Sequence, residues 1–114
     1  MSDQEFKGLN PKSKAGESIY FYSMDYWIGL CNCFVMVCGE DFEPFATLAE
    51  KEAKALGERL QLMLDIGLLK NCFQQSAIHS HDDEGEAADY VETMLDYAAE
   101  YIEFLKNCGG CEPV

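Results

Sequence analysis

The sequence predicts a mainly helical domain, a small bundle of three to four helices that allows one short strand near the N-terminus. Two long segments carry apolar residues at helical spacing, and a third is apolar on every side. Glycines stand where each of these helices would end. With 114 residues, of which 48% are apolar, the chain is long enough to bury a single hydrophobic core.

The beginning of the chain predicts little regular structure. Residues 1–17 are polar and contain glycine and proline, which is typical of a loosely ordered N-terminal arm. We expect residues 18–114 to form the single helical domain. Its first segment, SIYFYS at 18–23, is aromatic and β-branched enough to predict a short strand.

The segment DYWIGLCNCFVMVCG predicts a central helix. Only Asn32 is polar between Trp27 and Cys38, so we expect both sides of this helix to be largely buried. Asp25 stands where an N-cap would lie, and Gly39 would end the helix.

The clearest helical pattern covers residues 47–66. Thr47 and Glu50 match the T-x-x-E capping box, and Gly67 supplies a stop. Lysine and acidic residues alternate on its polar face, as is normal for a solvated surface. Residues 68–78 predict a short helix, followed by a polar linker.

A last helix is predicted over residues 86–106, stopped by Gly109 and Gly110. One of its faces has small and medium apolar residues at alternating spacings of three and four, which indicates a packing seam inside the chain or, alternatively, in a homodimer. The seam consists of Ala88, Val91, Leu95, Ala98, Ile102 and Leu105.

Two further stripes of residues run along the surface of this last helix. Tyr90, Met94, Tyr97, Tyr101 and Phe104 form an aromatic stripe that is either a wide core face or a contact ridge for a partner. Acidic residues form the other stripe, without any lysine, although like charges three or four residues apart destabilise a helix. The predicted contact residues are Asp82, Asp83, Glu86, Asp89, Glu92, Asp96, Glu100, Glu103, Tyr90, Tyr97 and Tyr101.

The formal net charge of −13 makes naked nucleic acid and anionic membranes poor partners. A basic protein, in particular one that binds nucleic acid, fits this charge better. A solubilising surface is the alternative interpretation of the acidic stripe, but it leaves unexplained why lysine is missing only there.

Cysteines and histidines supply the residue types of a metal site. Cys108 and Cys111 form C-G-G-C, and His79 and His81 form H-x-H. Their spacings do not match a structural zinc site, so we expect no cofactor, with these four residues as the alternative for a small metal-binding structural domain. No nucleophile motif or phosphate-binding loop is present, so we expect no enzymatic activity.

Two segments, FYSMDYWIGLCNCF and FLKNCGGC, resemble small bacterial and phage domains with a tryptophan-bearing early helix and a glycine-pair terminus. In size and acidity the chain resembles phage-encoded inhibitors of host defence, including anti-CRISPR proteins, and toxin-immunity proteins. This resemblance implies a non-enzymatic inhibitor that mimics nucleic acid, or an immunity protein, and it assigns no functional residues. Because no apolar run is long enough for a signal sequence or membrane span, we expect a cytoplasmic location, that of the host if a phage encodes the chain.

Overall fold

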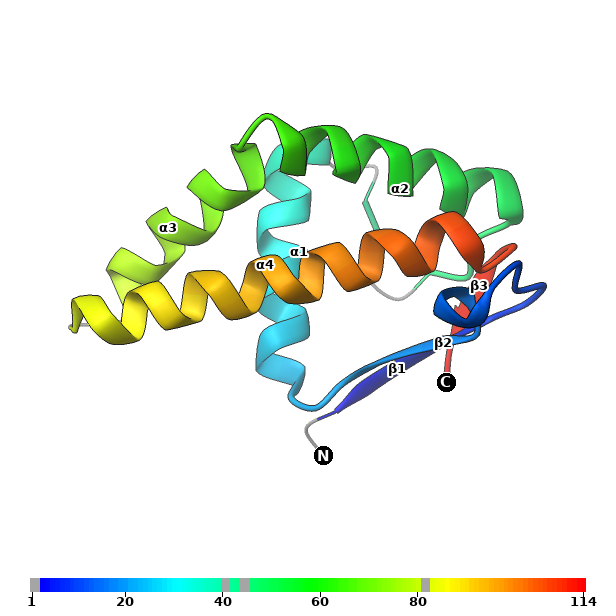
Figure 1. The fold of residues 1–114 in the computed structure, drawn as a ribbon, viewed down its shortest axis with the longest axis horizontal. Coiled ribbons are helices and arrows are strands. Elements are labelled where there is room, and N and C mark those ends of the chain that lie inside the picture. The colour runs from blue at the N-terminus through cyan, green and yellow to red at the C-terminus, as the bar shows by residue number, and fades with distance from the viewer. Residues whose placement is uncertain (1–2, 40–41, 44–45, 81–82) are drawn as a thin grey trace.

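The computed structural model describes residues 3–39, 42–43, 46–80 and 83–114. Within these residues the chain forms four α-helices and a three-stranded antiparallel sheet, so the predicted mainly helical fold with a short N-terminal strand is confirmed (Figure 1). In chain order the elements are β1 (Gln4–Gly8), the 3-10 turn η1 (Lys14–Gly16), β2 (Ser18–Phe21), α1 (Met24–Cys38), α2 (Glu50–Asp65), α3 (Leu68–Ser80), α4 (Glu84–Asn107) and β3 (Cys111–Pro113).

The sheet has the order β2-β1-β3, which places β1 at its centre. Phe6 of β1 lies opposite Ile19 on one side and Pro113 on the other, and its side chain is 2% exposed. The expectation of a loosely ordered arm is therefore wrong for residues 4–8. This segment is held because both of its edges are hydrogen-bonded and its one aromatic residue enters the core.

The helices are arranged around α4, which contacts α1, α2 and α3. Figure 1 shows α2 and α4 side by side, with α1 crossing behind α4 and the sheet at the end of α4. Gly57 permits the close approach of α2 and α4, because a Cβ atom there would lie 3.1 Å from the Cβ of Leu105. The seam predicted on the last helix packs within this chain at Val91, Ala98, Ile102 and Leu105.

Helix α1 differs from its prediction in two ways. Its N-cap is Ser23, whose Oγ accepts a hydrogen bond from the backbone N–H of Asp25 at 3.2 Å. Its outer face is open, because Ile28, Val35 and Met36 are 47%, 40% and 74% exposed. The expectation that both sides of this helix are buried is wrong, since the bundle covers only the face that carries Trp27.

Helix α2 begins three residues later than predicted. The backbone N–H of Ala49 donates to the Glu52 side chain at 3.0 Å, so Glu52 caps the helix and Thr47 lies exposed before it. The predicted stop is confirmed, because Gly67 adopts φ 85°, a conformation that favours glycine.

The core is built around the ring of Tyr101, which is 3% exposed. Its centroid lies 5.2 Å from that of Trp27 in an edge-to-face arrangement and 5.7 Å from that of Phe34 in a stacked one. Phe6 and Phe21 approach it from the sheet, each at 6.3 Å. One α4 residue thus connects α1 and the sheet, which fixes the orientation of the remaining faces of α4.

Candidate functional site

Helix α4 presents its acidic residues to solvent. Asp83 is the N-cap, and its Oδ1 accepts from the backbone N–H groups of Gly85 at 2.7 Å and Glu86 at 3.4 Å. The stripe that follows is exposed at every position, namely Asp89, Glu92, Asp96, Glu100 and Glu103. None of these acids takes part in an ion pair with any residue the structure describes. Asp82 lies outside the described residues.

Tyrosines from three elements lie beside this stripe. One shallow hollow of about 360 Å³ is lined by Tyr20, Tyr22, Thr93, Asp96, Tyr97 and Glu100. A second, of about 290 Å³, is lined by Tyr26, Glu86, Asp89, Tyr90 and Thr93. Because Thr93 borders both hollows, they form one surface, which we call the tyrosine-carboxylate face. It consists of Tyr20, Tyr22, Tyr26, Tyr90 and Tyr97 with Glu86, Asp89, Asp96 and Glu100.

The tyrosines of this face are held by contacts with one another. The rings of Tyr20 and Tyr22 meet edge to face at 5.0 Å, and those of Tyr26 and Tyr97 lie 5.3 Å apart. The Tyr20 hydroxyl donates a hydrogen bond to the carboxylate of Asp3. Side chains fixed in this way lose little further conformational entropy when a partner binds, which favours affinity.

The phenols of Tyr20 and Tyr97 have a raised pKa and stay protonated at neutral pH. Burial, followed by the proximity of Tyr26, Glu100 and Tyr22, raises the pKa of Tyr97. The hydrogen bond to Asp3 is the main cause of the raised pKa of Tyr20. The face therefore combines hydroxyl donors with carboxylate acceptors, and no lysine or arginine is among the described residues that line it.

The structure buries one residue of the predicted contact set and divides the exposed ones between different hollows. Tyr101 is buried at the centre of the core, so it cannot touch a partner of the folded protein. Glu92 lines a groove between α3 and α4 together with Lys70 and is not among the residues that line the two hollows beside the tyrosines. Glu103 is exposed and lines a further hollow with Tyr20, and its carboxylate accepts a hydrogen bond from the Asn107 side-chain amide at 3.2 Å. Tyr90 and Tyr97 lie half-buried at the edge of α4, where they contribute to the face.

Sequence reasoning missed Tyr20, Tyr22 and Tyr26, of which Tyr22 is 76% exposed. They belong to β2, the β2–α1 junction and α1, more than 60 residues before the acidic stripe, and only the tertiary fold brings them to α4. The three tyrosines within YFYSMDY were the available signal, because exposed clustered tyrosines are typical of protein interfaces.

His79 and the C-G-G-C cysteines lie at opposite ends of α4. His79 is in the last turn of α3, near the start of α4, whereas Cys108 and Cys111 follow the end of α4 (Figure 1). The 24 residues of α4 separate them by about 36 Å. His81 lies outside the described residues. Among the residues that the structure describes, no group of three His, Cys, Asp or Glu side chains is arranged to hold a metal ion.

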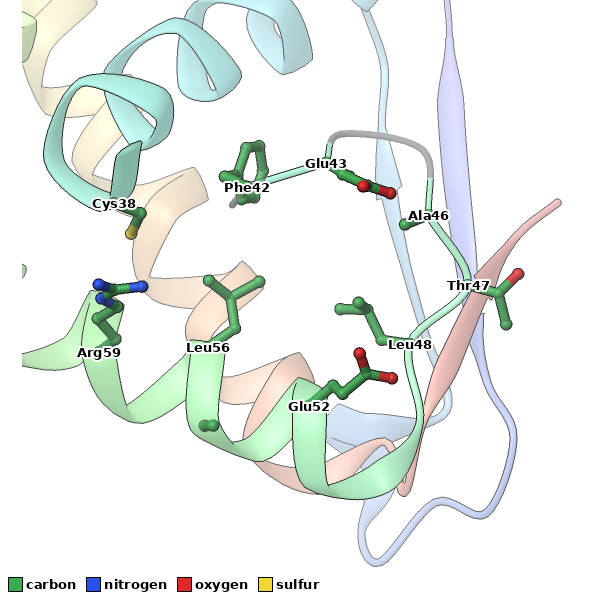
Figure 2. A pocket seen from close by; sticks show the side chains of 10 residues that line it. Cys38, Phe42, Glu43, Ala46, Thr47, Leu48, Glu52, Leu56 and Arg59 are labelled. Atoms are coloured by element: carbon green, nitrogen blue, oxygen red, sulfur yellow. The ribbon is translucent and has the colours of Figure 1, made fainter. Parts of the chain in front are cut away.

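Another hollow, of about 520 Å³, lies between α2 and residues 42–43 and 46–48. Figure 2 shows Arg59 and Cys38 at one side of it, Glu43 and Glu52 at the other, and apolar side chains between them. This hollow therefore presents charges of both signs, in contrast to the uniformly acidic tyrosine-carboxylate face.

No protein-family model matches the chain, and neither a curated protein nor a solved structure similar to it was found. Over the described residues, each helix is too short or too polar to cross a lipid bilayer.

Proposed function

We propose that this protein is a non-enzymatic inhibitor whose tyrosine-carboxylate face covers a basic, nucleic-acid-binding surface of a larger protein that belongs to a defence system. One observation carries this proposal. Exposed carboxylates run along α4 beside tyrosines from three elements, and among the residues that the structure describes no lysine or arginine lines the two hollows of this face.

The acidic stripe weakens the helix that carries it. Asp96 stands four residues from both Glu92 and Glu100, and each such like-charge pair costs a helix a few tenths of a kcal/mol. Scattered lysines would remove this cost, as they do on α2. A basic partner explains why α4 keeps the repulsion, since binding replaces it with attraction.

Tyrosines give such a surface affinity beyond simple attraction. Tyr22 and Tyr97 offer rigid aromatic area, and a guanidinium group of a partner can stack on a tyrosine ring while a carboxylate accepts its hydrogen bonds. Aromatic residues of this kind dominate the binding energy of many interfaces.

The spacing of the carboxylates supports mimicry of nucleic acid. Successive acids of the stripe are three or four residues apart, which corresponds to about 4.5–6 Å along the helix axis. Phosphates of one DNA strand follow each other at about 3.4 Å along the duplex axis, so the two charge rows have comparable density. The net charge of −13 also accelerates encounter with a basic partner.

Affinity capture from host lysate tests the proposal. The tagged protein should retain a nucleic-acid-binding protein after nuclease treatment, release it at raised salt, and lose it when DNA or RNA is added as competitor. Capture of a basic toxin would instead assign the protein as an immunity protein. Binding that neither salt nor nucleic acid weakens would contradict the proposal.

A matched bait shows whether this face makes the contact. Asp89→Lys with Asp96→Lys changes two exposed acids of the face and leaves the buried side of α4 intact. We expect this bait to lose the partner while its circular dichroism remains that of the wild type.

A further inference from the structure

A groove of about 610 Å³ lies between α3 and α4, two helices that diverge from the end of α3 and the start of α4 (Figure 1). Two of its lining residues are charged, Lys70 and Glu92, and two are glutamines. The other lining residues are apolar, namely Ala77, Ile78, Ala87, Ala88, Val91 and Leu95. An apolar surface of this kind is a candidate site for a second protein surface.

The groove continues the packing seam of α4. In the C-terminal half of the seam, Ala98, Ile102 and Leu105 are at most 1% exposed, because they pack into the core. In the N-terminal half, Ala88 is exposed and Leu95 is half-buried, and both line the groove. One continuous run of spacings of three and four thus begins in an open groove and ends in the core. Its open half is a packing surface that the rest of this chain leaves uncovered over the described residues.

The charges of the groove favour a second copy of this chain as its occupant. Because Lys70 and Glu92 are its only charged lining residues among those described, their formal charges cancel, whereas the whole chain carries −13. A strongly acidic partner is repelled by this net charge, and a strongly basic one is attracted to the tyrosine-carboxylate face instead. Two copies repel each other least where their surfaces are neutral. At this groove Lys70 of one copy can also pair with Glu92 of the other.

The groove is complementary to itself in shape as well. Ile78 of α3 lines it although this residue is 66% exposed, so a large apolar side chain is available for contact. Across from α3, residues 87 and 88 of α4 are alanines, whose short side chains leave space for a larger one. A two-fold symmetric interface uses the same patch on both copies, so it needs a patch that offers both a projecting side chain and a hollow.

We propose that the α3–α4 groove is a homodimer interface, in which two copies pack these helices against each other around a two-fold axis. Ile78 of each copy fills the alanine-lined wall of the other, and Lys70 of each copy pairs with Glu92 of the other. The proposal is independent of the function proposed above, because no residue of the tyrosine-carboxylate face lines this groove.

Analytical ultracentrifugation of the full chain tests the proposal. The protein is kept reduced, at about 0.15 M salt, where repulsion between distant charges is screened. We expect the measured mass to rise from 12.8 kDa towards twice that value as the protein concentration increases. A wild-type protein that stays monomeric up to about 1 mM would overturn the proposal.

Two isoleucine variants show whether the groove makes the contact. Ile78→Glu places a carboxylate in the apolar interface, and we expect it to keep the protein monomeric with unchanged circular dichroism. Ile66→Glu is the matched control, because Ile66 is 60% exposed at the end of α2 and does not line the groove. It should dimerise like the wild type. A dimer that survives Ile78→Glu, or one that both variants weaken equally, would contradict the assignment of the interface.

A charge exchange tests the symmetric pairing. Lys70→Glu brings two acids together at both symmetric contacts and should weaken dimerisation by about 10-fold or more. Lys70→Glu combined with Glu92→Lys restores opposite charges and the wild-type net charge, so it should recover most of this loss. A double variant that dimerises no better than Lys70→Glu alone would overturn the proposed pairing.

Discussion

Helices α2 and α4 pack against the same core but expose different charges. Helix α2 carries four acidic and three basic residues, and α4 carries seven acidic residues and one basic residue, Lys106 in its last turn. Both helices belong to one chain, so a general need for negative charge does not explain the difference. The basic residue of α4 lies outside the part of the helix that borders the tyrosines, and the basic partner proposed above would account for this difference between the two helices.

The largest expected change in stability distinguishes the buried Tyr101 from the half-buried Tyr97 of the same helix. Tyr101→Ala removes the ring at the centre of the aromatic core, and we expect it to lower the free energy of unfolding by about 3–5 kcal/mol. Tyr97→Ala, at the half-buried edge, should cost roughly 1 kcal/mol in stability but weaken partner binding by about 2 kcal/mol. Urea unfolding of both variants measures the difference. Equal losses of stability would show that both rings serve the core alone.

A second contrast concerns the thiols and predicts a pH dependence of stability. Because the pKa of Cys108 is lowered to about 7 from its ordinary value of 9.0, the folded state loses this proton at a lower pH than the unfolded state does. Cys108 alone should therefore raise the free energy of unfolding between about pH 7 and 9, by on the order of 1–3 kcal/mol, and this gain is lost as the pH falls through 7. Burial raises the pKa of Cys31, Cys33 and Cys38, and these thiols lower the free energy of unfolding toward pH 9, so the contribution of Cys108 is the difference between the wild type and Cys108→Ala.

Cys108→Ala should remove this rise, and unfolding curves at several pH values measure it. Cys33→Ala is the control with the opposite sign. Because the pKa of Cys33 is raised to about 12 from 9.0, only the unfolded state loses this proton toward pH 9, so removing the thiol should make the rise slightly steeper. A Cys108→Ala protein whose stability varies between pH 7 and 9 in the same way as that of the wild type would contradict the lowered pKa of Cys108.

The smallest expected change in stability comes from replacing one exposed acid by lysine on each of the two helices. Asp96→Lys replaces two repulsions with two attractions, toward Glu92 and Glu100, and should stabilise the protein by about 0.5–1 kcal/mol. Glu58→Lys on α2 places a lysine four residues after Lys54 and should be neutral or slightly destabilising. Thermal unfolding at low salt measures both. A destabilised Asp96→Lys protein would refute the claim that the acidic stripe opposes folding.

The helices could be predicted from the sequence because their apolar periodicity and glycine stops are local signals. Strands β1 and β3 could not, since β1 has one buried aromatic residue, Phe6, in a polar segment and β3 has only three residues. The exposed face of α1 was hidden by apolar residues on all sides of the helix. Length and hydrophobicity do not show which side the rest of the fold covers.

The candidate site was predicted in part. The acidic stripe follows from helical spacing alone, and its exposure was expected. Spacing could not separate Tyr97 from Tyr101, which lie four residues apart, because β2 and α1 cover one ring and leave the other at the edge. Nor could it place Tyr20 and Tyr22 beside α4, because that contact depends on the docking of β2.

The most direct test of the central claim compares two charge-matched double variants for their affinity toward the captured partner. Asp89→Lys with Asp96→Lys alters the tyrosine-carboxylate face, and Glu58→Lys with Asp65→Lys makes the same change of net charge at exposed positions of α2. Titration at low and raised salt should show a loss of about 10- to 100-fold or more for the α4 variant and little change for the α2 variant. Equal losses would mean that net charge alone drives binding, and an unaffected α4 variant would mean that the acidic stripe is only a solvated surface.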